Sequence, residues 1–168
     1  MILRRVYLLS DDQDAVVGQP LGLLVILIVA SAIIASLCLS IPNLIKESQI
    51  QKVEREIDRI LVEATNMFEY ADNGSIVTIP VEFPSSMQFI VFGYLPRNGT
   101  NEPTNLTLEE KTSNNYFYVM NDGTLRTFHS NARFSNRNMT QIAIFHSGNY
   151  DITLELCQMG GKTYVTMQ

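Results

Sequence analysis

The sequence predicts an α+β protein in which a transmembrane helix continues into an amphipathic helix and a small antiparallel β domain follows. Three observations predict this class. Residues 21 to 41 are apolar and uncharged, residues 43 to 72 repeat apolar side chains every three or four positions, and residues 73 to 168 alternate short β-prone runs with turn residues. The 168 residues leave room for one small core after the anchor.

The anchor, residues 21 to 41, reads LGLLVILIVASAIIASLCLSI. A helix of this length extends ~30 Å at ~1.5 Å per residue, which matches the hydrocarbon core of a bilayer. We therefore expect membrane lipid around this helix, a single pass through the cell membrane, and an extracytoplasmic C-terminal domain.

Residues 1 to 20 form a leader that carries Arg4 and Arg5 and then three aspartates before the apolar run. A secretory signal peptide cleaved within the run is one alternative, because Ala30-Ser31-Ala32 has the small-x-small form of a cleavage site. Cleavage there would leave an apolar stub on the mature chain. We therefore expect the apolar helix to be retained, with the leader on the cytoplasmic side.

The leader runs into the anchor through Asp14-Ala15-Val16-Val17-Gly18-Gln19-Pro20-Leu21-Gly22. This stretch resembles the processing region of archaeal type IV pilin-like proteins, whose class III signal peptide is cut before the apolar helix. The resemblance implies a processing peptidase that cleaves between Gly18 and Gln19. Pro20 would then stand in the first turn of the mature helix, where its missing N–H leaves no hydrogen bond unmade. The alternative is an ordinary uncleaved single-pass anchor.

Residues 43 to 72 predict an amphipathic helix, separated from the anchor by a break at Pro42. Lys52 with Glu56 and Arg59 with Glu63 have the spacing of favourable i,i+4 pairs. We expect the apolar stripe to pack on the molecule's own sheet, although a coiled coil with a neighbouring subunit would also bury it. The stripe consists of Ile50, Val53, Ile57, Ile60, Ala64 and Met67, and Leu61 and Phe68 widen it.

The remaining chain predicts a sheet of five to seven antiparallel strands. Pro80 and Pro84 predict that the first strand lies at a sheet edge or is shortened. Asn121-Asp122-Gly123 and Gly160-Gly161 predict two hairpins, and residues 96 to 114 predict a long surface loop. The expected strands are Ile76 to Phe83, Met87 to Tyr94, Tyr116 to Met120, Leu125 to His129, Gln141 to Phe145, Tyr150 to Cys157 and Lys162 to Thr166.

Four asparagines stand in the acceptor pattern for N-glycosylation, and all of them follow the anchor. The same residues are also common turn formers, which is the alternative interpretation. Their use would require an exported domain, although the basic residues after the helix favour the opposite orientation. These candidates are Asn73, Asn98, Asn105 and Asn138.

The sequence predicts no catalytic, metal or cofactor site. His129 and His146 lie on different predicted strands without carboxylates at ligand spacing, and no nucleophile or phosphate-loop motif occurs. Basic and acidic residues nearly balance after Asp72, which argues against a nucleic-acid surface. Cys38 lies in the anchor and Cys157 near the C-terminus, so we expect no disulfide between them.

The expected function is structural: a membrane-anchored cell-surface protein, pilin-like or a minor pseudopilin subunit. Its expected partners are lipid around residues 21 to 41, the processing peptidase, and like subunits or other pilins. The alternative is a monomeric single-pass membrane protein whose β-rich domain binds a ligand outside the cell. A third hypothesis is an enzyme with its site in the distal sheet.

Overall fold

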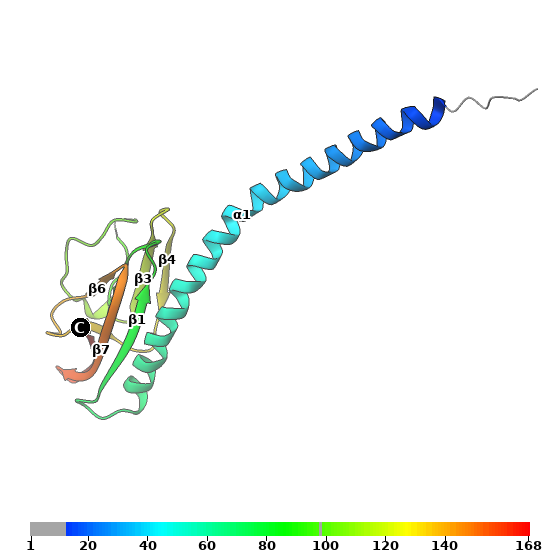
Figure 1. Cartoon of the computed structure of the whole chain (residues 1–168). Helices are drawn as coiled ribbons and strands as arrows, with labels where there is room; N and C mark the ends of the chain where they lie inside the picture. Colours follow the sequence, from blue (N-terminus) through cyan, green and yellow to red (C-terminus); the bar gives the residue numbers. More distant parts are fainter. Residues whose placement is uncertain (1–12, 98) are drawn as a thin grey trace, which may run out of the picture. The chain divides into compact units, whose positions relative to one another are not determined.

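The computed structural model describes the backbone of residues 13–97 and 99–168, and the side chains of residues 21–97 and 99–168 (Figure 1). One long helix, α1 (Gln13–Tyr70), precedes a β domain that is mostly antiparallel, which confirms the α+β class. Two compact units divide the chain, Met1–Lys46 and Glu47–Gln168. The strands are β1 (Ile76–Phe83), β2 (Met87–Phe92), β3 (Asn115–Met120), β4 (Leu125–His129), β5 (Phe134–Asn136), β6 (Ala143–His146), β7 (Gly148–Met159) and β8 (Lys162–Met167).

The predicted break at Pro42 is not seen, because the residues on both sides of it belong to α1. Proline removes its own N–H bond to the carbonyl four residues earlier and its ring clashes with that carbonyl, but the remaining bonds of a helix this long keep the chain helical. The helix ends at Tyr70, two residues before the predicted end at Asp72. Gly74, with φ of 87°, lies in the turn that follows.

The amphipathic part of α1 packs on the molecule's own sheets, as predicted. Every residue of its apolar stripe is at most 4 % exposed, and Leu61 and Phe68 pack at the margin. The stripe shares one core with the inner faces of both sheets, including Val81, Leu154 and Tyr118. Burial of this stripe is the main apolar contact between the helix and the sheets. It stabilises the packing by about 25 cal/mol for each Å² of apolar surface removed from water.

The ion pairs of this helix differ from the predicted ones. Lys52 Nζ donates to Glu82 Oε1 on β1 at 2.9 Å, and Arg59 Nη1 donates to Glu56 Oε2 at 2.9 Å, one turn earlier in α1. The i,i+4 spacing alone could not reveal the first of these, because its acceptor comes from a strand. Since most of these side chains are substantially exposed, such pairs contribute little to stability.

The β domain holds two four-stranded sheets in the described part of the chain, where we had predicted one. Sheet A has the order β1-β7-β8-β5, and sheet B has the order β4-β3-β2-β6. Strand β5 was not predicted; it has three residues and runs parallel to β8, with Phe134 beside Val165. A strand this short carries no alternation that the sequence could display. The two predicted hairpins are confirmed, with Gly123, Gly160 and Gly161 at positive φ.

Strand β1, which contains Pro80 and is followed by Pro84, forms one edge of sheet A, as predicted. Thr153 of β7 exchanges both backbone hydrogen bonds with Gln168, on the β8 side, so it does not bond to its β1 neighbour Thr78. The N–H and C=O of Thr78 therefore point away from β7. Because backbone direction alternates along a strand, those of Ile76 and Glu82 do the same, and Pro80 presents only a carbonyl.

The loop predicted over residues 96 to 114 is more than a surface connection. It contains the 3-10 helix η1 (Glu110–Thr112), buries Thr112 and Ser113, and sets Leu108 against the outer face of sheet B. That face is apolar, with Phe89, Val91, Phe117 and Val119 all at most 1 % exposed. An apolar outer face needs a cover, and this segment supplies part of it.

Candidate functional site

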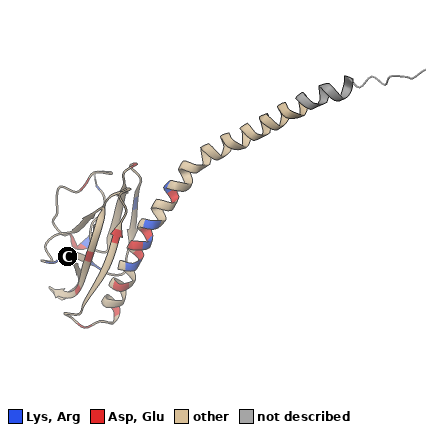
Figure 2. Ribbon diagram, in the orientation of Figure 1, with Lys and Arg blue, Asp and Glu red and all other residues tan. Residues whose placement is uncertain are grey.

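The first part of α1 presents an apolar surface on every side. From Leu21 to Ile45 every side chain is exposed within its unit, from 77 % at Leu39 to 49 % at Ile41 among the large apolar residues. No charged residue lies in this segment (Figure 2). At 1.5 Å per residue it extends about 37 Å, so it is long and apolar enough to cross a membrane. Signal sequences near an N-terminus share this length and composition.

Two of the three serines within this segment satisfy their hydroxyls inside the helix. Ser31 Oγ donates to the carbonyl of Leu27 at 2.7 Å, and Ser40 Oγ donates to that of Ser36 at 2.9 Å. Such back-bonding removes the cost of placing a free hydroxyl in an apolar environment. The segment therefore remains compatible with lipid despite these serines.

The candidate processing residues Gly18 and Gln19 belong to α1 by backbone, and their side chains lie outside the described ones. The helix begins at Gln13, so in this chain Pro20 lies inside the helix and not in its first turn. It would occupy the first turn only in a chain that begins at Gln19. Most of the leader, residues 1 to 12, lies outside the described residues.

Three of the candidate glycosylation sites are exposed in turns and loops of the Glu47–Gln168 unit. Asn73 precedes Gly74 in the turn after α1, and Asn138 lies in the turn after β5. Asn105 accepts a hydrogen bond through Oδ1 from the backbone N–H of Thr107 at 3.1 Å. The fourth, Asn98, lies outside the described residues. Their positions agree with both interpretations, acceptor and turn former.

The histidines lie at the surface. His129 contacts Asn114 and Asn115 through its ring nitrogens at 3.1 and 3.3 Å. His146 Nε2 lies 3.3 Å from Glu102 Oε2, and these side chains are 54 % and 47 % exposed. Among the described side chains, those of residues 21–97 and 99–168, no group of three His, Cys, Asp or Glu residues lies close enough to hold a metal ion. Cys38 and Cys157 are free thiols, and burial raises the pKa of Cys157.

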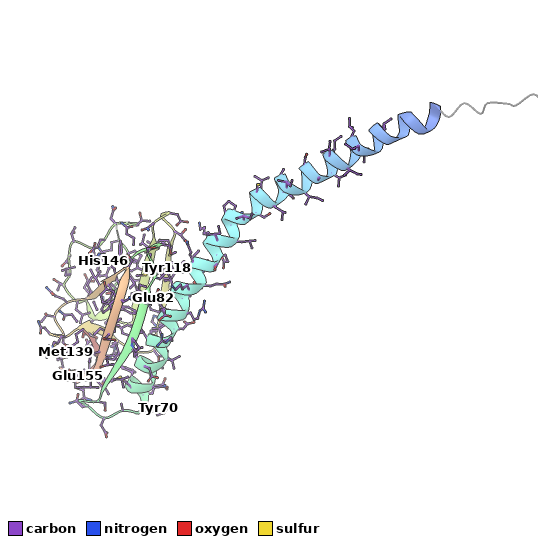
Figure 3. All side chains as sticks on the ribbon, in the orientation of Figure 1. Tyr70, Glu82, Tyr118, Met139, His146 and Glu155 are labelled. Atoms are coloured by element: carbon purple, nitrogen blue, oxygen red, sulfur yellow. The ribbon has the colours of Figure 1, made fainter. Side chains whose placement is uncertain are left out.

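A polar network joins α1 to sheet B. Glu54 Oε1 accepts hydrogen bonds from Tyr118 Oη at 2.9 Å and from Arg126 Nη1 at 2.7 Å. Tyr118, labelled in Figure 3, comes from β3 and is fully buried. Desolvation and the hydrogen bond to Glu54 raise the pKa of Tyr118, so the phenol stays protonated and donates. Sequence reasoning missed this network because its members are 64 and 72 residues apart.

Two hollows flank the amphipathic part of α1. One, of about 540 Å³, lies between the helix and β1 and is lined by Val62, Val77 and Ile79 with charged residues at its rim. The other, of about 240 Å³, lies on the β3 and β4 side, between Glu54 and Asp58 of the helix and aromatic residues of the sheet. Comparisons of the chain with protein-family models, with curated proteins and with solved structures gave no match.

Proposed function

We propose that this protein is a membrane-anchored structural subunit of the cell surface, pilin-like or a minor pseudopilin. The observation that supports it is the exposed apolar segment from Leu21 to Ile45. An exposed apolar surface of this size is costly in water, so the segment must be surrounded by lipid or by other apolar helices. A helix apolar all round is suited to both environments in turn.

The proposal places Leu21 to Ile41 across the cell membrane, with the β domain outside the cell and the leader removed after Gly18. The sequence Gly18-Gln19-Pro20 supports this cleavage by its resemblance to archaeal type IV pilin-like precursors. Removal of the leader would leave the apolar helix at the new N-terminus, where like subunits could pack around it. No catalytic role is proposed.

The intact mass of the protein extracted from membranes of its native host tests this proposal. We expect loss of residues 1 to 18, and a full-length chain would overturn the pilin-like reading. The substitution Gly18→Leu should keep the leader attached. Gly22→Ala is the matched control, because a methyl group there meets no atom within 4 Å and should leave processing unchanged.

Fractionation distinguishes assembly from the monomeric alternative. Shear releases surface filaments and leaves single-pass proteins in the membrane. A filament subunit should therefore appear in the sheared fraction as well as in membranes. Protein found only in membranes, with the β domain accessible to added protease on intact cells, would favour the monomeric binding protein.

A further inference from the structure

Aromatic rings stack across three strands of sheet B and end at its edge. Phe92, Tyr116 and Phe128 are neighbours across β2, β3 and β4. The ring centroids are 5.8 Å apart for Phe92 and Tyr116 and 5.2 Å for Tyr116 and Phe128, with interplanar angles of 26° and 14°. Tyr118 also lies nearly parallel to Phe128, at 6.0 Å and 19°.

Phe128 is the last ring of this stack because β4 is an edge strand. Its described ring contacts, with Tyr116 and Tyr118, both come from β3, on one side of the ring. No strand of sheet B lies on the other side. The ring is only partly buried, and no ring contact from beyond the edge of the sheet is described.

Two carboxylates of α1 face the same hollow. Glu54 and Asp58, one turn apart, line the cavity of about 240 Å³ together with Phe128 and both tyrosines. Like charges at this spacing repel each other and destabilise a helix. Arg126 neutralises Glu54, whereas Asp58 makes no hydrogen bond or ion pair with the residues that the structure describes. Asp58, which also lines the hollow beside β1 with Arg55 and Arg59, is therefore the carboxylate of this hollow that no described cation pairs with.

The charges of these two carboxylates also act on Tyr116, one of the aromatic residues that line the hollow. Desolvation, Asp58 and Glu54, in that order, raise the pKa of Tyr116 to about 12. The hollow thus combines an unpaired carboxylate with a partly exposed aromatic ring, and both features attract a cation. A planar cation satisfies both at once, because a guanidinium group stacks flat on a ring and donates along its edge to a carboxylate.

We propose that this hollow binds the guanidinium group of an arginine side chain from another polypeptide, which stacks on the outer face of Phe128 and pairs with Asp58. The site is independent of the proposed pilin-like function, since all its residues lie in the Glu47–Gln168 unit. Lysine fits less well because its compact ammonium cannot both stack and pair edge-on. A neutral flat group would stack but leave Asp58 without a counter-charge.

Titration of the full-length chain in detergent micelles tests the proposal. The probe is acetyl-Gly-Arg-Gly-amide, followed by NMR shifts of the Phe128 and Tyr116 ring signals. Matched peptides carry lysine or citrulline, the neutral counterpart of arginine, in place of arginine. We expect saturable shifts at these rings with the arginine peptide, about threefold weaker binding of the lysine peptide, and no saturation with the citrulline peptide.

Variants locate the binding. Asp58→Asn should weaken arginine-peptide binding about threefold, and Phe128→Leu about two- to fivefold. Asp151→Asn removes an exposed carboxylate outside this hollow and should change nothing. If Phe128→Leu disturbs folding, Asp58→Asn alone tests the proposal, because Asp58 is exposed. Equal shifts with the arginine and citrulline peptides, no saturable shifts, or unchanged affinity in Asp58→Asn would each overturn the proposal.

Discussion

Both parts of α1 are rich in aliphatic residues, but the first part exposes these side chains and the second part buries them. From Leu21 to Ile45 every side chain is exposed, whereas the stripe from Ile50 to Met67 is buried against the sheets. The difference lies in charge: the first part has none, and the second interleaves Lys, Arg, Asp and Glu with its apolar stripe (Figure 2). One part is therefore suited to an apolar surrounding on all sides, and the other to a boundary between core and water.

We expect the largest effect when an aspartate is placed in each part of α1 in turn. Ile57→Asp puts a carboxylate at a site that is 2 % exposed, and we expect it to cost about 4 kcal/mol or more and unfold the β domain. Ile28→Asp should leave the unfolding of that domain unchanged and instead weaken membrane insertion by about 3 kcal/mol. Chemical unfolding in micelles followed by tyrosine fluorescence measures the first effect, and alkaline extraction of membranes measures the second. Equal loss of domain stability in both variants would refute the division.

A smaller change tests whether only one face of the amphipathic part of α1 is buried. Ile60→Ala removes a fully buried side chain and leaves a cavity, so we expect a loss of about 2–4 kcal/mol in the free energy of unfolding. Val62, two residues later, is 59 % exposed, and Val62→Ala should stay within about 0.5 kcal/mol of the unsubstituted chain. Denaturant midpoints with unchanged slopes give both values. A similar loss in both variants would mean that Val62 is covered by another molecule.

The smallest effect concerns the contact of this helix with the phenols of β3. Because the pKa of Tyr116 is raised to about 12 in the folded chain, its neutral form is favoured by folding. This contribution to stability is fully present below pH 10 and is lost as the pH rises from about 10 towards 12. In a titration with base, the absorbance of phenolate at about 295 nm should therefore rise at a higher pH in the folded chain than in denaturant. Tyr116→Phe should reduce this difference between the folded and the denatured chain.

Much of this fold could be predicted from local patterns. The stripe of α1 and the strand Ile76–Phe83 follow from periods of 3.6 and 2, and Gly160-Gly161 marks a turn that needs positive φ. The division into two sheets could not be predicted, because strand order depends on pairings between distant residues. One signal was present but not used. The continuous apolar runs of β2 and β3 indicate strands buried on both faces, which requires a cover such as Leu108.

The two candidate sites also differ in whether the sequence could reveal them. The apolar segment from Leu21 to Ile45 is a property of consecutive residues and is visible in the sequence. The hollow beside Phe128 is not, since its walls come from α1, β3 and β4. The like-charged Glu54 and Asp58 were the only local sign, and a repulsive pair on a helix indicates a partner elsewhere without saying where.

The proposed membrane anchoring has a consequence for β1, which is an edge strand of sheet A. Proteins tethered to a membrane share a thin layer, so their local concentration is far higher than in free solution, and exposed strand edges then meet often. Pro80 offers no N–H at the middle of the outward row of β1, so an incoming strand would lose a central hydrogen bond. In the proposed membrane-anchored state, Pro80 would therefore oppose edge-to-edge pairing of sheets between neighbouring copies.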